Sequence, residues 1–197
     1  MTKGRLEAFS DGVIAILITI MVLELHVPHG ASFADLKPVV PTLLSYLLSF
    51  VFIAIYWNNH HHLLQAAKRV NGAVLWANMH LLFWLSLIPF VTAWMGENHF
   101  AHAPVAVYGG VLLLCGVAYF FLVRSLIALH GRDSAIAVAI GGDFKGLVSL
   151  AVYAIAIPLA FVSSALAWAL YAAVEILWLV PDRRFERTLA NHHTPHE

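Results

Sequence analysis

The sequence predicts an all-α, polytopic membrane protein with six transmembrane helices. Three observations carry this prediction: the composition, the length of the uncharged stretches, and the side on which the basic residues fall. Of the 197 residues, 61% are hydrophobic and 11% are charged, whereas soluble domains are about half apolar and about a quarter charged. The composition therefore excludes a soluble enzyme, a disordered chain and a nucleic-acid-binding domain, and it predicts a protein embedded in a lipid bilayer.

The predicted spans follow from the distribution of charge along the chain. A membrane core about 30 Å thick needs roughly 20 helical residues. The last apolar stretch, residues 146–180, contains only Glu175 as a charged residue, and at about 52 Å it is too long for one crossing. We expect it to fold back near Pro158 and the Ser163–Ser164 pair. The single domain, residues 1–197, then has spans at residues 6–25, 38–60, 72–95, 103–123, 146–162 and 165–180.

The basic residues predict the orientation, because cytoplasmic loops are enriched in Lys and Arg. With six spans, ten of the eleven basic residues fall on one side and only Lys37 falls on the other. We therefore expect a multi-pass protein of the inner cell membrane with both termini in the cytoplasm. The ten residues are Lys3, Arg5, Lys68, Arg69, Arg124, Arg132, Lys145, Arg183, Arg184 and Arg187.

The remaining general features limit the partners. Equal numbers of acidic and basic residues provide no overall field to attract phosphates, so no nucleic-acid partner is expected. The single cysteine, Cys115, lies in an apolar run and is expected to be a small buried residue. The longest polar loop, residues 124–145, has an apolar centre at residues 135–140 that we expect to lie on the membrane surface.

Polar residues gather at the start of the first span, where Ser10 is followed by Asp11. An ionisable group inside a span costs several kcal/mol unless it finds a partner or water. The cluster either holds helices together or forms a proton or ligand site. At a similar depth in other spans lie the possible partners of Asp11, namely Trp57, Asn58, His61 and His80, with Asn78 and Glu175 also nearby in depth.

Another face of the first span carries large aliphatic groups. At 100° per residue, Ile16, Ile20 and Leu23 form a ladder with Thr19 beside it. By periodicity alone, such a ladder is typical of helix packing, and a pore lining is the alternative.

Residues 5–24, RLEAFSDGVIAILITIMVLE, contain the pattern R-x-x-x-F-S-D-G followed by an apolar run with a threonine and a final glutamate. This segment strongly resembles the signature of the bacterial TMEM175 family of potassium channels. The resemblance implies a homotetramer in which the first helix of each subunit lines a central pore, with potassium as the permeant ion, no cofactor and no enzymatic activity. It also implies roles for individual residues: bracing by Arg5, Phe9, Ser10 and Asp11, pore constriction by Ile16, Ile20 and Leu23, and cation selection by Thr19.

The resemblance thus implies a potassium leak channel of modest selectivity. The chain has no TVGYG filter, so a ring of Ile16 side chains would form a hydrophobic constriction that closes by dewetting. Hydroxyl groups of Thr19 would replace part of the hydration shell of the ion. Glu24, at the outer end of the helix, would concentrate cations before the constriction.

Two other functions remain open from the residues themselves. A secondary transporter would use Asp11 or Glu175 as its coupling site, although such sites usually lie at the midplane on broken helices. A metal or haem protein would use some of the twelve histidines, above all residues 60–62 and His80. Since consecutive helical residues point 100° apart, at most one or two of the run converge on one ion, and we expect no metal site.

Overall fold

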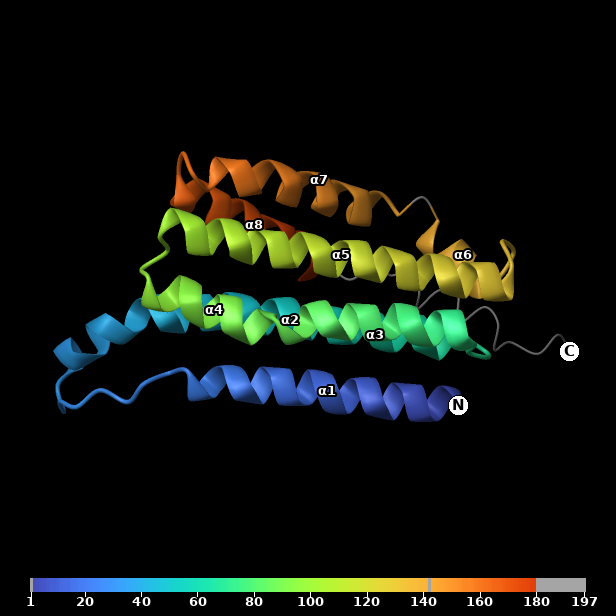
Figure 1. The fold of residues 1–197 in the computed structure, drawn as a ribbon, viewed down its shortest axis with the longest axis horizontal. Coiled ribbons are helices and arrows are strands. Elements are labelled where there is room, and N and C mark those ends of the chain that lie inside the picture. Colours follow the sequence, from blue (N-terminus) through green and yellow to red (C-terminus); the bar gives the residue numbers. More distant parts are fainter. Residues whose placement is uncertain (1, 142, 180–197) are drawn as a thin grey trace, which may run out of the picture.

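The structure is a computed structural model that describes residues 2–141 and 143–179, and within these residues every regular element is a helix. Figure 1 shows the helices lying side by side along a common long axis. In chain order they are α1 (Lys3–Leu23), the 3₁₀ helix η1 (Phe33–Val39), α2 (Val40–Ala66), α3 (Gly72–Ser86), α4 (Ile88–Glu97), α5 (His102–His130), α6 (Ala135–Ile140), α7 (Phe144–Leu159) and α8 (Ser164–Leu179).

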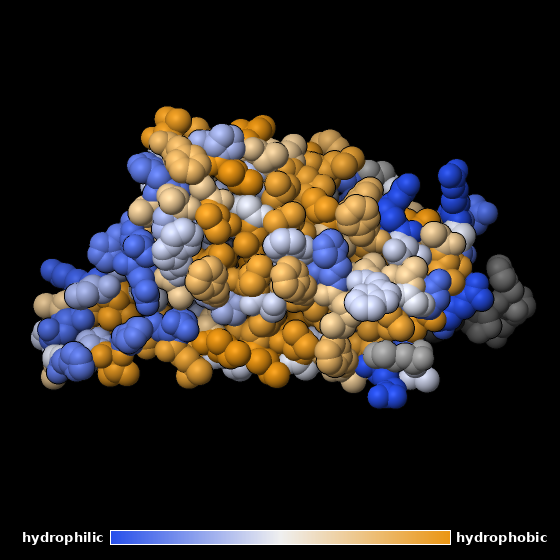
Figure 2. All heavy atoms as spheres, viewed as in Figure 1, coloured by the Kyte–Doolittle hydropathy of each residue, from blue (hydrophilic) through white to orange (hydrophobic). Residues whose placement is uncertain are grey.

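The arrangement places α1 at one edge of the subunit and α5 between α3 and α7 (Figure 1). The N-terminus and the α2–α3 connection lie at one end of the bundle, and η1 and the α7–α8 turn lie at the other. Lys3 and Lys68 are therefore at the end opposite Lys37. Figure 2 shows a broad hydrophobic band between two hydrophilic ends, which is the surface expected of a protein that crosses a bilayer.

The helices coincide in position with the six predicted segments. Among the described residues, four helical stretches are long and apolar enough to cross a membrane, namely Lys3–Leu23, Phe33–Ala66, Gly72–Glu97 and His102–His130. The last two helices, α7 and α8, are apolar but have 16 residues each. Their connection falls at residues 160–163, next to Pro158 and before Ser164, where the sequence predicts the fold back. The tail arginines at 183, 184 and 187 lie outside the described residues.

The predicted span over residues 72–95 corresponds to one apolar stretch, Gly72–Glu97, which a turn at Leu87 divides into α3 and α4. Pro89 lies in the first turn of α4 and has no backbone N–H, so the hydrogen-bond ladder of α3 cannot continue through it. In the first turn of α4 the hydroxyl of Thr92 donates to the carbonyl of Ile88 at 2.6 Å. Helix α4 then packs against α2 and α5.

Two other boundaries differ from the expected ones. Helix α5 continues to His130, and α2 continues to Ala66, because a charged residue such as Arg124 ends an apolar stretch without ending a helix. The short α6 is apolar on both sides and exposes Val138, which is 61% accessible. Ile136 is fully buried where α6 contacts α2 and α5, so this segment closes one end of the bundle.

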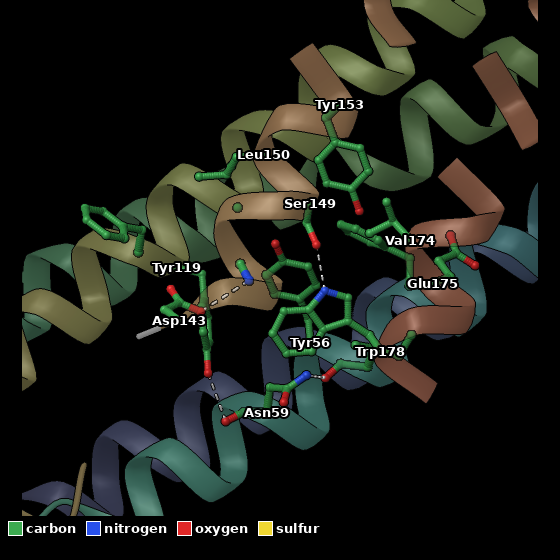
Figure 3. Close-up of a pocket in the computed structure, with 15 residues that line it drawn as sticks. Tyr56, Asn59, Tyr119, Asp143, Ser149, Leu150, Tyr153, Val174, Glu175 and Trp178 are labelled. Carbon is green, nitrogen blue, oxygen red and sulfur yellow. Dashed lines mark hydrogen bonds between the residues drawn. The ribbon is translucent and has the colours of Figure 1, made fainter. Parts of the chain in front are cut away.

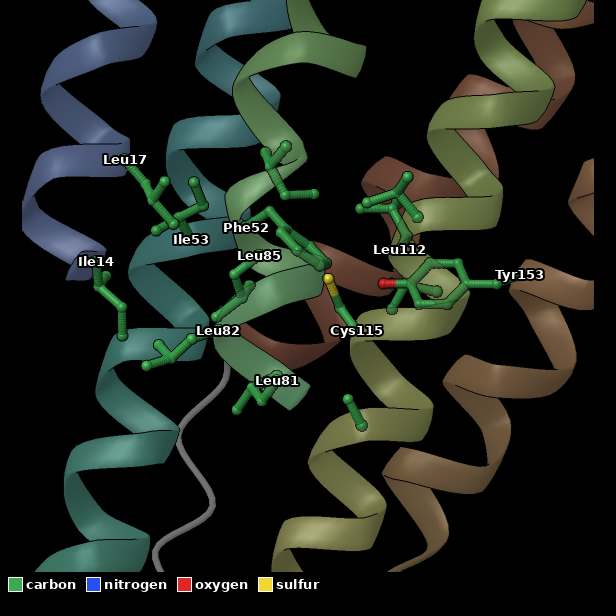
Figure 4. Close-up of a cluster of buried hydrophobic side chains, with 14 of the residues drawn as sticks. Ile14, Leu17, Phe52, Ile53, Leu81, Leu82, Leu85, Leu112, Cys115 and Tyr153 are labelled. Carbon is green, nitrogen blue, oxygen red and sulfur yellow. The ribbon is translucent and has the colours of Figure 1, made fainter. Parts of the chain in front are cut away.

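The core consists of interdigitating side chains between these helices (Figure 4). Cys115 is fully buried there, as the sequence predicts, between Phe52 and Tyr153 in the view of Figure 4. Gly109 on α5 has no Cβ, and the ring of Tyr171 on α8 occupies the space that a Cβ would need. Small residues at such contacts let membrane helices approach closely. Close packing is important there because lipid is as apolar as the side chains, so the hydrophobic effect does not drive the helices together.

Candidate functional site

The aliphatic ladder of α1 is exposed in the isolated subunit. Ile16, Ile20 and Leu23 have 56%, 40% and 77% of their surface accessible. Thr19 lies among them, and its hydroxyl donates within the helix to the carbonyl oxygens of Ile16 at 2.9 Å and Ala15 at 3.1 Å. A hydroxyl has one hydrogen and two lone pairs, so the Thr19 oxygen keeps acceptor capacity on the exposed face.

A different face of α1 packs into the subunit. Its buried residues are Leu6, Ser10, Ile14, Leu17 and Met21. They meet α2, α3 and α4, and Figure 4 shows Ile14 and Leu17 directed toward those helices. The ladder is therefore not needed to hold α1 on its own subunit, and it forms an apolar surface available to other copies of the helix.

Behind this packing face lies a buried polar chain that joins three helices. The amide nitrogen of Asn78 on α3 donates to the hydroxyl oxygen of Ser10 at 3.0 Å. The amide oxygen of Asn78 lies 2.7 Å from Nε2 of His60 on α2, and since that oxygen only accepts, Nε2 carries the proton. All three residues are at most 1% exposed. Ser10 completes the chain by donating to the Leu6 carbonyl at 2.9 Å.

Asp11 lies beside the packing face, on the flank of α1 opposite the ladder side. The indole N–H of Trp57 on α2 donates to its carboxylate at 3.0 Å. The Trp57 ring is half-exposed and stacks on the ring of His61, with 5.8 Å between centroids. Of the candidate partners, Trp57 thus contacts Asp11 directly, and His61 supports Trp57.

The other two candidate partners of Asp11 are placed elsewhere. His80 on α3 is exposed and accepts a hydrogen bond from the indole of Trp84 at 2.8 Å. Asn58 is exposed on α2. Asn58 is adjacent to Trp57, and His80 is less than one helical turn from Asn78, yet neither forms the bond that its neighbour forms. Depth in the membrane is similar for such neighbours, so depth alone does not predict which face of the helix a residue occupies.

The phenyl ring of Phe9 is 47% exposed and Arg5 is exposed, so Ser10 is the signature residue that enters the subunit core. Phe9 lies toward the ladder side of α1, and Asp11 lies on the opposite flank. Asp11 is partly accessible and accepts its hydrogen bond from Trp57 of the same subunit, while the neighbouring Ser10 is the residue that is buried in the core.

The histidine run does not converge on one point. His60 bonds to Asn78, and His61 stacks on Trp57. Within residues 2–141 and 143–179, no three His, Cys, Asp or Glu side chains are placed to hold a metal ion together. His60 therefore joins α2 to α3, whereas His61 contacts a residue of its own helix.

A second hydroxyl cluster was not anticipated from the sequence. The Ser49 hydroxyl on α2 lies 2.6 Å from the Thr92 hydroxyl on α4 and 2.9 Å from the Tyr108 hydroxyl on α5. All three are buried. Their common depth is readable from the sequence, but their pairing depends on how the three helices are rotated relative to one another. The cluster ties the helices that support α1 to the α5 side of the bundle.

Comparison with known proteins agrees with this arrangement. The sequence model of the family described as endosomal/lysosomal potassium channel TMEM175 matches residues 5–89. A potassium channel of Chryseobacterium sp. is 52% identical over 189 residues, 96% of this chain and 98% of the relative. A potassium channel of Streptomyces collinus is 32% identical over 188 residues, 89% of this chain and 91% of the relative.

Among solved structures, the fold matches the crystal structure of a lysosomal potassium-selective channel TMEM175 homolog from Chamaesiphon minutus. The TM-score is 0.75 at 29% sequence identity, and the match covers 91% of this chain and 97% of the other. The chain is thus 52% identical to a relative along almost its whole length, its first helix lies within the family match, and its fold is shared with a solved member. The chain therefore belongs to the TMEM175 family.

Proposed function

We propose that this chain is a subunit of a potassium leak channel whose pore is lined by α1. The relatives that match almost the whole chain are named potassium channels. The observation that carries the proposal on this chain is the exposed ladder of Ile16, Ile20 and Leu23, with the Thr19 hydroxyl beside it. No catalytic activity and no cofactor are proposed, and potassium is the permeant ion.

The protein is a multi-pass membrane protein, and we propose that it crosses the inner membrane six times. Helices α7 and α8 would each span about 24 Å, which suffices for a thinned bilayer or a hairpin whose ends are embedded in the bundle. The end that holds Lys3, Lys68 and Arg69 is assigned to the cytoplasm, in accord with the enrichment of basic residues there.

A single α1 cannot enclose a path, so the proposal requires several subunits around an axis. A ring of identical subunits makes head-to-tail contacts that close when the rotation is a simple fraction of a turn. We propose a homotetramer, following the resemblance of residues 5–24. Four copies of the ladder would then face one another, and the packing face of each α1 would stay on its own subunit.

The proposed mechanism combines a hydrophobic constriction with hydroxyl groups. Four Ile16 side chains at one level narrow the path and exclude water until the helices dilate or rotate. Potassium passes such a constriction more readily than sodium because it loses hydration water at lower cost. Oxygen lone pairs of Thr19, three residues along the helix, would replace part of that water. The resulting selectivity is modest because no carbonyl filter surrounds the ion.

Two contacts hold α1 in position for this role. The Ser10–Asn78–His60 chain fixes the rotation of the buried face, and the Trp57–Asp11 bond fixes the flank. We propose that these groups brace the helix rather than carry the ion, since Ser10, Asn78 and His60 are buried away from the exposed ladder.

The proposal is tested by ion flux from liposomes that contain the purified protein. Potassium-loaded liposomes are diluted into potassium-free buffer with a proton-sensitive dye and a protonophore, and valinomycin gives the full signal. We expect potassium flux that exceeds sodium flux and needs no counter-transported substrate. Equal flux in protein-free liposomes, or flux that requires a proton gradient, would contradict a passive potassium channel.

A further inference from the structure

A cavity of about 60 Å³ lies inside the subunit between α2, α5, α7 and α8, and no residue of α1 lines it (Figure 3). One water needs roughly 10–15 Å³ of such space, so the cavity has room for about four to six waters or one small organic ion. Its walls combine aromatic rings, among them Tyr56, Tyr153 and Trp178, with two carboxyl groups, Asp143 and Glu175.

Glu175 is the unusual member of this wall. Only 5% of its surface is exposed, and its Oε1 atom has no hydrogen-bond partner among the described residues. It forms no ion pair within the part of the chain that the structure describes. A buried carboxyl oxygen without a donor is costly, because the group loses its hydration and gains nothing in exchange. Any donor in the cavity would satisfy this oxygen, and a donor that carries positive charge would also stabilise the ionised carboxylate.

Several neighbouring polar groups already have partners, whereas the hydroxyls of Tyr56 and Tyr153 form no hydrogen bond among the described residues. The indole of Trp178 donates to the hydroxyl of Ser149 at 2.9 Å, and that hydroxyl donates to a main-chain carbonyl at 2.8 Å. The Tyr119 hydroxyl donates to the Asn59 carbonyl at 3.3 Å. Asp143 accepts from the Gly146 N–H at 3.3 Å, and partial burial raises the pKa of its carboxyl group. None of these hydrogen bonds is made to Oε1 of Glu175.

The aromatic walls suit a cation as well as an alkyl group. A positive charge is attracted to the face of a Trp or Tyr ring. The chain provides an example at this place, since the ammonium of Lys145 lies 5.8 Å from the centroid of the Trp178 ring. An apolar chain of two to four carbons would pack against the remaining ring surfaces.

We propose that this cavity binds a primary alkylammonium ion whose N–H group donates to Oε1 of Glu175. A primary ammonium has three N–H donors, whereas a quaternary ammonium has none. A metal ion fits less well, because the described residues bring no three carboxylate, imidazole or thiolate groups together. The ligand is either a free amine or the ethanolamine headgroup of a lipid. The site is separate from the α1 ladder, so it goes beyond the proposed channel function.

The test measures binding and not flux. The full-length protein is placed in nanodiscs of phosphatidylglycerol, which has no amine, and titrated calorimetrically with butylammonium. We expect saturable binding that Glu175→Gln weakens at least about tenfold, because a charge-assisted hydrogen bond is lost. The matched control Glu97→Gln removes an exposed carboxylate at the end of α4 and leaves the affinity unchanged. Tetramethylammonium and butanol bind more weakly than butylammonium.

Asp143→Asn serves as a second variant in case Glu175→Gln does not fold, because Asn caps a helix about as well as Asp. It weakens binding about threefold or more through the lost charge. Adding phosphatidylethanolamine to the nanodiscs separates the two sources: competition identifies a lipid headgroup, and unchanged affinity identifies a free amine. No saturable binding to the wild-type protein, or binding that neither variant alters, overturns the proposal.

Discussion

The indole nitrogen of Trp57 lies 3.0 Å from the carboxylate of Asp11 and joins the middle of α2 to the flank of α1. This bond runs beside the buried Ser10–Asn78 contact, so adjacent residues of α1 are attached to two different helices. A helix held at two points about 100° apart around its axis resists rotation as well as translation. The exposed face of α1 is thereby given a defined direction.

The first prediction concerns the constriction. Ile16→Asn places a polar amide where a hydrophobic ring would exclude water, so we expect potassium flux to rise several-fold. Ile176→Asn on α8 is the matched control, because Ile176 is 64% exposed and Ile16 is 56% exposed. The control is expected to leave flux at the wild-type level. Liposome flux equal for Ile16→Asn and the wild type would remove Ile16 from the pore.

The second prediction concerns selectivity. Thr19→Val keeps the size of the side chain and removes the hydroxyl oxygen, so we expect the potassium-to-sodium permeability ratio to fall toward one. Thr19→Ser keeps the hydroxyl and is expected to keep the ratio. The measurement is the reversal potential under bi-ionic conditions. A reversal potential that Thr19→Val does not shift would show that the hydroxyl takes no part in selection.

The third prediction concerns the buried polar chain. Asn78→Leu leaves the hydroxyl of Ser10 and the ring of His60 without their shared partner, and we expect a loss of about 1–3 kcal/mol in stability. Thermal unfolding in detergent, followed by loss of monodisperse protein, measures the effect. Asn58→Leu changes an exposed asparagine on α2, close in sequence to His60, and is expected to be nearly neutral. Equal destabilisation by both variants would argue against a special role for the chain.

The fourth prediction concerns the Trp57–Asp11 bond. Trp57→Phe and Asp11→Asn each weaken it, and the double variant should lose less than the sum of the two, with a coupling energy of about 1 kcal/mol. Native mass spectrometry at high detergent concentration is expected to show a smaller fraction of intact oligomer for all three variants than for the wild type. Strictly additive losses, or an intact oligomer whose flux gains a new pH response, would favour a proton role for Asp11 instead of bracing.

Several features of the fold were predictable because they depend on residues close in sequence. Charge-free stretches located the helices, and the turn after Pro158 followed from the length of the last stretch. The turn at Leu87 inside the third span is equally local, since Pro89 cannot donate a main-chain hydrogen bond, although hydropathy alone does not indicate it. The extension of α5 to His130 was missed because Arg124 ends the apolar stretch without ending the helix.

The partners of the site residues were only partly predictable. Trp57 was among the expected partners of Asp11, while the Ser10–Asn78–His60 chain and the Ser49–Thr92 pair were not expected as such. Membrane depth selects a group of residues on each helix. Choosing one member of that group requires knowing the rotation of each helix, which no single segment contains.

By itself, the sequence determined that the chain is helical and apolar, where its helices lie, and that Ile16, Ile20 and Leu23 share one face of α1. These follow from the helical period and the cost of placing charge in a bilayer. Only the tertiary structure decided that this face is left open, that Ser10 rather than Asp11 enters the core, and that Glu175 lines an internal cavity. The physical reason is that packing between distant segments sets the rotation and tilt of every helix, and a turn of 100° exchanges a buried residue for an exposed one.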